Sequence, residues 1–281
     1  MIHHAGIGTY IRNLLPHLQL HQVPLRSSIY TLKEQIEFSR KIPPCDLFWS
    51  PHFNVPLFPI KAKKRIVTIH DVYHLDHPQS FAKYTYAKML YRKAVEASAR
   101  IITVSEFSKG RILHHFPQAK EKITVIHPGA DHLLHVEPKP IETPSSFFLF
   151  VGNEKPHKNL SLVRKVIPNL IVVNGSLPIE NLCWLYRNAE ALIFPSFYEG
   201  WGLPPLEAMS LGCPVVTSNA ASIPEACQNA ALYFDAKSPE DLKRALSLLP
   251  EKKEALIAKG KERSSQLTWK HAARQHAEFL L

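Results

Sequence analysis

Short apolar runs rich in β-branched and aromatic residues recur along the chain, separated by longer stretches in which apolar residues return with helical spacing. In the first 140 residues these runs lie at Leu47–Ser50, Ile66–His70, Ile101–Ser105 and Thr124–His127. After residue 140 they lie at Phe147–Val151, Leu170–Val173, Ala191–Phe194, Pro214–Thr217 and Ala231–Phe234. Alternation of strands and helices with short connections predicts an α/β protein with parallel sheets covered by helices.

The helical stretches are clearest where charged and apolar residues fall on different sides. The stretch Phe81–Ser98 places Lys and Arg on one side and Leu, Tyr and Ala on the other. Further helices are predicted at Ile179–Asn188, Pro205–Leu211, Pro239–Leu249 and Trp269–Leu281. Each of these helices would cover a face of a predicted sheet.

A polar, proline-rich stretch divides the two sets of strands. Pro138, Pro140 and Pro144 stand among charged and small residues, a composition typical of an extended linker. We therefore expect an N-terminal domain at 1–137, a linker at 138–145 and a second domain at 146–262. Residues 263–281 should form a C-terminal helix that packs back toward the first domain. Two such domains form a cleft, and ligands bind parallel sheets at the carboxyl ends of their strands.

Composition excludes two classes of protein. A hydrophobic fraction of 45% with 21% charged residues is that of a globular chain and not of a disordered one. No apolar run reaches the roughly 18–20 residues that span a bilayer. The first residues show no secretory signal, and the four cysteines have neither CxxC nor zinc spacing, so we expect reduced thiols in a cytoplasmic protein.

Charge is distributed unevenly along the chain. The net charge is +10, and residues 1–140 hold 19 Lys and Arg against 10 Asp and Glu, whereas residues 141–281 hold 15 against 14. A basic face suits nucleic acid, anionic lipid or a phosphorylated substrate, and it is equally compatible with a solvated surface that has no partner.

The segment 195–208 carries the most specific chemistry. A predicted strand ends at Phe194, a loop with Gly200 and Gly202 follows, and a helix begins near Pro205. The glycines allow backbone N–H groups to approach a ligand at a helix N-terminus, which is a favourable place for an anion. Glu199 and Glu207 are suited to accept hydrogen bonds from the hydroxyls of a sugar or a ribose.

This segment, EGWGLPPLEAMSLGCPVV, resembles the retaining glycosyltransferases of family 4, in which two glutamates are separated by seven residues. The resemblance continues in chain order at Thr68–Asp71, Thr103–Lys109, Val125–Asp131, Phe150–Leu160, Ser222–Glu225 and Leu267–Trp269. It implies the GT-B fold, an α/β architecture of two Rossmann-like domains facing a cleft. Both sheets should be reduced, because the strand that usually precedes the glycine loop is missing and the segment Ser161–Asn181 is short.

The resemblance also assigns roles to residues. It makes His70 and Glu199 the catalytic residues beside the donor sugar, Lys158 the donor-phosphate lysine and Glu207 the ribose-binding carboxylate. The remaining donor-binding residues are contributed by two glycine-containing loops, at Gly6 and Gly8 near the N-terminus and at Gly200, Trp201, Gly202 and Leu203.

The chemistry expected of such a site is the breaking of a glycosyl–phosphate bond. The leaving group carries negative charge, which a lysine, backbone amides and a helix N-terminus can stabilise. Because no DxD sequence is present, we expect neither a metal ion nor a cofactor.

The predicted function is therefore metal-independent, retaining transfer of a hexose from a nucleotide-sugar to a glycan or lipid-linked acceptor. GDP-mannose is the first donor expected and UDP-glucose the second. The basic half predicts peripheral contact with an anionic membrane surface at its inner face, and no nucleic acid is expected. The alternatives are a non-catalytic remnant that binds nucleotide-sugar or glycan and, behind it, an epimerase of the same fold.

Overall fold

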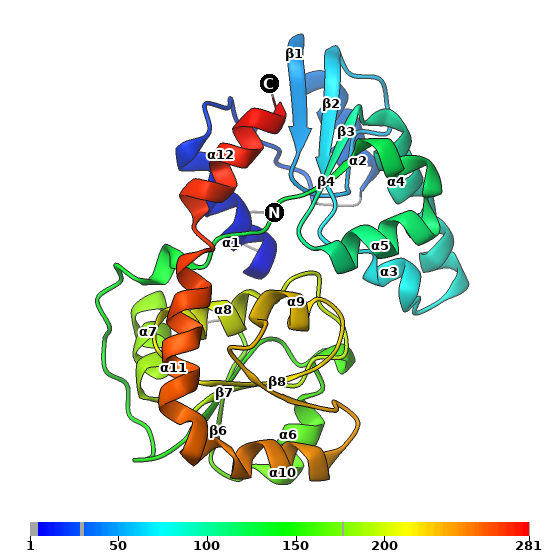
Figure 1. Ribbon diagram of the computed structural model, residues 1–281. Helices are drawn as coiled ribbons and strands as arrows, with labels where there is room; N and C mark the ends of the chain where they lie inside the picture. Colours follow the sequence, from blue (N-terminus) through cyan, green and yellow to red (C-terminus); the bar gives the residue numbers. More distant parts are fainter. Residues whose placement is uncertain (1–4, 29–30, 176, 281) are drawn as a thin grey trace. The chain divides into compact units, whose positions relative to one another are not determined.

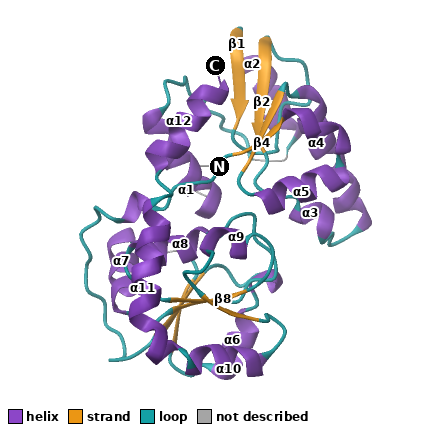
Figure 2. Cartoon of the chain, in the orientation of Figure 1, coloured by secondary structure: helices purple, strands orange, loops and turns teal. Residues whose placement is uncertain are grey.

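The computed structural model describes residues 5–28, 31–175 and 177–280. The chain divides into two compact units, Met1–His127 with Ala273–Leu281 (unit 1) and Pro128–Ala272 (unit 2). Each unit has its own parallel sheet with helices packed against it, as Figures 1 and 2 show. The prediction of an α/β protein with two parallel sheets is confirmed.

The sheet of unit 1 has four parallel strands in the order β1-β2-β3-β4. They are β1 (Cys45–Ser50), β2 (Ala62–Thr68), β3 (Arg100–Thr103) and β4 (Ile123–Val125). The register places Trp49 beside Ile66, Val67 beside Ile101, and Ile102 beside Thr124. The apolar runs of the sequence therefore become the buried middle of the sheet.

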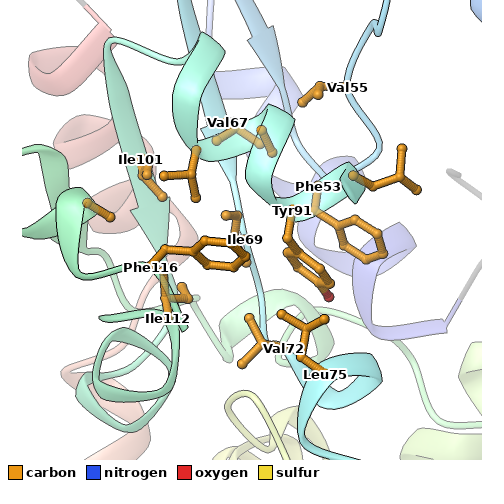
Figure 3. Packing of buried hydrophobic residues seen from close by; sticks show 14 of the residues in the cluster. Phe53, Val55, Val67, Ile69, Val72, Leu75, Tyr91, Ile101, Ile112 and Phe116 are labelled. Atoms are coloured by element: carbon orange, nitrogen blue, oxygen red, sulfur yellow. The ribbon is translucent and has the colours of Figure 1, made fainter. Parts of the chain in front are cut away.

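One face of this sheet is covered by α3 (Tyr73–Asp76), α4 (Phe81–Ala97) and α5 (Glu106–His115). The side chains of Ser80 and Ser105 cap α4 and α5 by accepting hydrogen bonds from the backbone N–H groups of Lys83 and Ser108, respectively. Figure 3 shows the resulting core, in which the Phe53 and Tyr91 rings stack with their centroids 4.1 Å apart.

Helix α1 (Ala5–Leu14) corrects one expectation. Gly6 and Gly8 lie inside this helix and not in a glycine loop. Glycine lowers helix propensity, yet Tyr10, Ile11 and Leu14 are buried at helical spacing, and their burial outweighs it. The Tyr10 hydroxyl lies 2.5 Å from His276 Nε2 of α12 (Trp269–Leu280). Unit 1 also contains α2 (Leu32–Lys41).

The sheet of unit 2 has five parallel strands in the order β6-β5-β7-β8-β9. They are β5 (Phe148–Val151), β6 (Leu170–Val173), β7 (Leu192–Phe194), β8 (Val215–Ser218) and β9 (Leu232–Phe234). Apolar residues of α6 (Leu160–Val166), α10 (Pro239–Ser247) and α11 (Leu249–Ser265) pack on one face. Figure 1 shows α7 (Ile179–Asn188) and α8 (Leu203–Ser210) on the side of the sheet opposite to α6 and α10, while α11 runs alongside α8, with Gly260 against Met209. Helix α9 (Ile223–Cys227) follows β8.

The strand predictions are confirmed for all nine apolar runs, with ends that differ by up to four residues. Residues 138–145 form neither helix nor strand, and Lys139 is held by backbone and side-chain hydrogen bonds to Glu180 and Asn181 at the start of α7. The predicted domain boundaries stay predictions. In the described part of the chain, no helix combines the length and the apolar character needed to cross a membrane.

Candidate functional site

The site is built at the carboxyl edge of the unit 2 sheet, where the loops after β5 and β7 meet. The Phe197 N–H donates to the His157 carbonyl at 2.8 Å, which joins the two loops directly. The buried Asn159 amide adds hydrogen bonds to the carbonyls of Pro195 at 3.3 Å and Ala236 at 2.7 Å. Asn159 has a φ of 54°, a left-handed conformation that asparagine tolerates better than most residues. These contacts fix the loops against each other.

An ion pair lies within this loop pair. Lys158 Nζ is 2.6 Å from Glu199 Oε1, and the two side chains are 15% and 12% exposed. The ammonium group also lies 5.5 Å from the centroid of the Phe194 ring. The fold thus brings together two of the predicted site residues, 41 positions apart in the sequence.

The glycine loop that follows Glu199 ends at the N-terminus of α8. Gly202 has a φ of 104°, a conformation that side chains rarely adopt, and Pro204 and Pro205 lie in the first turn of the helix. The Ser222 hydroxyl contacts the carbonyl oxygens of Glu199 at 2.9 Å and Trp201 at 3.1 Å, which holds the loop in place. The helix begins two residues before the predicted Pro205, because proline fits its first turn. Its N-terminus carries partial positive charge.

Glu207 lies in α8 and is largely buried, with partners for both carboxylate oxygens. Tyr186 of α7 donates its hydroxyl to Oε2 at 2.9 Å, and His132 Nε2 lies 3.2 Å from Oε1. Burial and the neighbouring Glu207 raise the pKa of Tyr186 well above its usual value, so its phenol stays a proton donor.

Sequence reasoning did not identify Tyr186, His132 or Asn159 as parts of the site. Asn159 lies within one segment that carried the resemblance and His132 directly follows another, so their signal was their position in or beside motif residues, whereas Tyr186 lies in the predicted helix Ile179–Asn188. Which side chain of a motif contacts a carboxylate depends on the packing of helices and loops, and only the structure supplies it.

His70 lies just after β2 in unit 1 and is half-buried. Its Nε2 is 3.0 Å from the Pro51 carbonyl, and its ring meets Tyr10 edge-on with centroids 4.7 Å apart. Burial lowers the pKa of His70 to about 4, so the ring is neutral at pH 7 and acts as a hydrogen-bonding group and not as a cation.

The predicted residues are therefore divided between the units. Lys158, Glu199, Glu207 and the 200–203 loop lie in unit 2, whereas His70, Gly6 and Gly8 lie in unit 1. Their roles toward a donor stay predictions. Within the described residues, no group of three or more His, Cys, Asp or Glu is placed to hold a metal ion, and the expected independence from metal also stays a prediction.

Comparison with known families gives one match for each half of the chain. Residues 44–132 match the family described as Glycosyltransferase Family 4, and residues 125–251 match the one described as Glycosyl transferases group 1. The two matches together run without a gap from residue 44 to residue 251.

Individual relatives agree with these matches. The chain is 29% identical to the O-antigen chain mannosyltransferase RfbU of Salmonella typhimurium strain LT2, over 78% of this chain and 69% of that protein. It is 26% identical to the O-antigen chain mannosyltransferase B of Escherichia coli, over 82% of this chain and 72% of that protein. A solved sucrose-phosphate synthase from Thermosynechococcus elongatus has a similar fold, with a TM-score of 0.71 at 16% identity over 93% of this chain and 81% of that one.

Proposed function

We propose, on the premise that this chain belongs to glycosyltransferase family 4 and has the GT-B fold, that it transfers a hexose from a nucleotide-sugar to a glycan or lipid-linked acceptor. The proposed transfer retains the anomeric configuration of the sugar and needs no metal ion. One observation carries the proposal. Lys158, Glu199 and the N-terminus of α8 meet at the carboxyl edge of the unit 2 sheet, where parallel sheets bind their ligands.

Each part of this arrangement has a task in the proposed reaction. Lys158 supplies a positive charge, and the amides at the start of α8 supply oriented dipoles for the negative charge that develops on the leaving diphosphate. Glu199 forms an ion pair with the lysine and accepts hydrogen bonds from hydroxyls of the donor sugar. Glu207 accepts hydrogen bonds from the hydroxyls of the donor ribose.

We propose GDP-mannose as the donor, because the relatives with the matches described above are mannosyltransferases, and UDP-glucose as the second candidate. A glycan built for the cell surface is the proposed acceptor class, since those two relatives act on O-antigen chains.

Turnover of the donor tests this proposal against a non-catalytic binding protein. The purified protein is incubated with GDP-mannose or UDP-glucose, without acceptor and with EDTA, and release of the nucleoside diphosphate is measured. Slow hydrolysis of one donor that persists in EDTA supports a metal-independent transferase. Binding without hydrolysis, followed by no transfer to any lipid-linked or soluble glycan, would favour the non-catalytic remnant.

Substitution of the two glutamates should have different effects on nucleotide binding and on turnover. Glu207→Ala is expected to weaken binding of the bare nucleoside diphosphate by about 10- to 100-fold, because it removes a charged acceptor of ribose hydroxyls. Glu199→Ala should leave nucleotide binding within about threefold and lower turnover. Titration calorimetry with GDP and UDP measures the first effect, and steady-state kinetics measures the second. Equal loss of nucleotide affinity in both variants contradicts the assignment.

We also propose that unit 1 binds the surface of an anionic membrane at its inner face. Helix α4 exposes Phe81 and Met89, which are 84% and 47% exposed, on a helix that carries basic residues at Lys83, Lys88, Arg92 and Lys93. A basic residue near an anionic leaflet contributes about 1 kcal/mol, and salt screens this attraction.

Vesicle co-sedimentation tests the membrane proposal. The wild type should sediment with vesicles of phosphatidylglycerol and phosphatidylcholine at low salt and be released at high salt. A variant with four basic residues of unit 1 changed to Gln should remain in the supernatant; these are Lys63, Lys64, Lys88 and Arg92. A matched control changes four exposed lysines of unit 2 to Gln and should still sediment; these are Lys237, Lys243, Lys252 and Lys259. Wild-type protein that stays soluble with anionic vesicles at low salt would rule out this role.

A further inference from the structure

The Glu207 carboxylate belongs to a longer hydrogen-bonded chain within unit 2. Its Oε1 meets His132 Nε2 at 3.2 Å, and the other ring nitrogen of His132, Nδ1, meets Trp269 Nε1 at 3.1 Å. The His132 and Glu207 side chains are 8% and 10% exposed, and Trp269 is 2% exposed. Three side chains from distant parts of the sequence thus form one buried line.

The direction of these hydrogen bonds follows from the chemistry of the groups. An indole N–H can only donate, so His132 Nδ1 must accept and carries no proton. The proton of the neutral ring is then on Nε2, which donates it to Glu207 Oε1. Trp269 therefore selects the His132 tautomer that can hold Glu207.

Trp269 is itself fixed by the backbone around it. Its backbone N–H donates to Asp131 Oδ1 at 2.8 Å, and the backbone N–H of Ala130 donates to the Leu267 carbonyl at 2.8 Å. Gly129 allows this approach, because a Cβ built there would lie 2.2 Å from the Trp269 nitrogen. The segments 129–132 and 267–269 are therefore pinned together, and His132 and Trp269 have little freedom to turn.

A fixed carboxylate is useful to a ligand-binding site. A glutamate side chain that is free to rotate loses conformational entropy when it binds a ligand, and one that is already held does not. Tyr186 and His132 use one acceptor position on each Glu207 oxygen. A carboxylate has about four acceptor positions, so others remain for ligand hydroxyls.

We propose that His132 and Trp269 are positioning residues that hold Glu207 in the orientation in which it accepts the ribose hydroxyls of the donor nucleotide. This inference rests on the proposed role of Glu207. It gives a physical task to Trp269, the last residue of the Leu267–Trp269 motif.

The test compares a nucleotide with its ribose-truncated form. Dissociation constants of GDP and of 2′,3′-dideoxy-GDP are measured by calorimetry, with UDP and its dideoxy form as a second pair. The wild type should prefer the complete ribose by about 10- to 100-fold, the size of a hydrogen bond to a charged group. Trp269→Phe keeps an aromatic ring and removes the N–H donor, and this preference should fall below about threefold.

Three further variants separate positioning from general damage to the fold. Trp184→Phe makes the same exchange at a tryptophan of α7 that packs on Phe147, and it should keep the wild-type preference. His132→Phe should lose the preference, whereas His132→Gln retains an amide donor for Glu207 and should keep more of it. Affinity for the dideoxy nucleotide should be the same in all folded variants, because it does not use Glu207.

Each outcome bears on a definite claim. An unchanged ribose preference in folded Trp269→Phe and His132→Phe overturns the positioning proposal and leaves the ribose role of Glu207 intact. A wild type that binds both forms equally overturns the ribose role, and the positioning proposal with it. A wild type that binds neither nucleotide overturns donor binding as a whole.

Discussion

Replacement of Lys158 by alanine is expected to lower kcat/KM for the nucleotide-sugar by about 30- to 1000-fold. This range corresponds to about 2–4 kcal/mol, the usual effect of removing one group that stabilises charge in a transition state. The loss should exceed that of an ordinary surface lysine, because Lys158 is only 15% exposed and its removal leaves the largely buried Glu199 carboxylate without its cationic partner. Steady-state kinetics of donor hydrolysis or transfer measures it.

Two variants control this experiment. Lys155→Ala removes the same charge from an exposed position three residues earlier and should leave the kinetics within about twofold. Lys158→Arg keeps a cation beside Glu199 and should lose less activity than Lys158→Ala. A folded Lys158→Ala protein with wild-type kinetics would remove this lysine from the site.

The largest effect on stability is expected for Gly129→Ala. The added Cβ would lie 2.2 Å from the Trp269 nitrogen and 2.6 Å from the Thr268 carbonyl carbon, and backbone atoms cannot turn aside as a flexible side chain can. We expect a loss of about 3 kcal/mol or more in the free energy of unfolding, or failure to accumulate as folded protein.

Urea unfolding followed by circular dichroism measures this loss. The matched control is Gly110→Ala in α5, where no atom lies within 4 Å of the added Cβ. This control should raise stability by up to about 1 kcal/mol, because alanine favours a helix more than glycine does. Equal stability of the two variants would show that the segments 129–132 and 267–269 are not held together as described.

The strands were predictable because burial on both faces of a parallel sheet produces continuous apolar runs, and these are visible without any structure. The pairing of Lys158 with Glu199 was not predictable from spacing, although both residues were expected in the site. Their contact depends on β5 and β7 being neighbours in the sheet, which is a property of the topology.

Local sequence was misleading where tertiary packing decided the outcome. Gly6 and Gly8 suggested a loop, but Tyr10 and Leu14 bury one side of the segment and make it a helix. His132 and Tyr186 showed no pattern of their own, because a buried partner of a carboxylate is defined by contacts across the fold. The buried strands could therefore be read from the sequence, whereas the first helix and the side-chain networks could not.

The division of the chain into units has a consequence for its biosynthesis. Unit 1 takes its last segment, Ala273–Leu281, from beyond the whole of unit 2, and this segment contributes His276 as the partner of Tyr10. Although most of unit 1 is synthesised first, it cannot complete its fold until the residues beyond unit 2 have also left the ribosome. A variant truncated before Ala273 should accordingly impair the folding of the half of the protein that was made first.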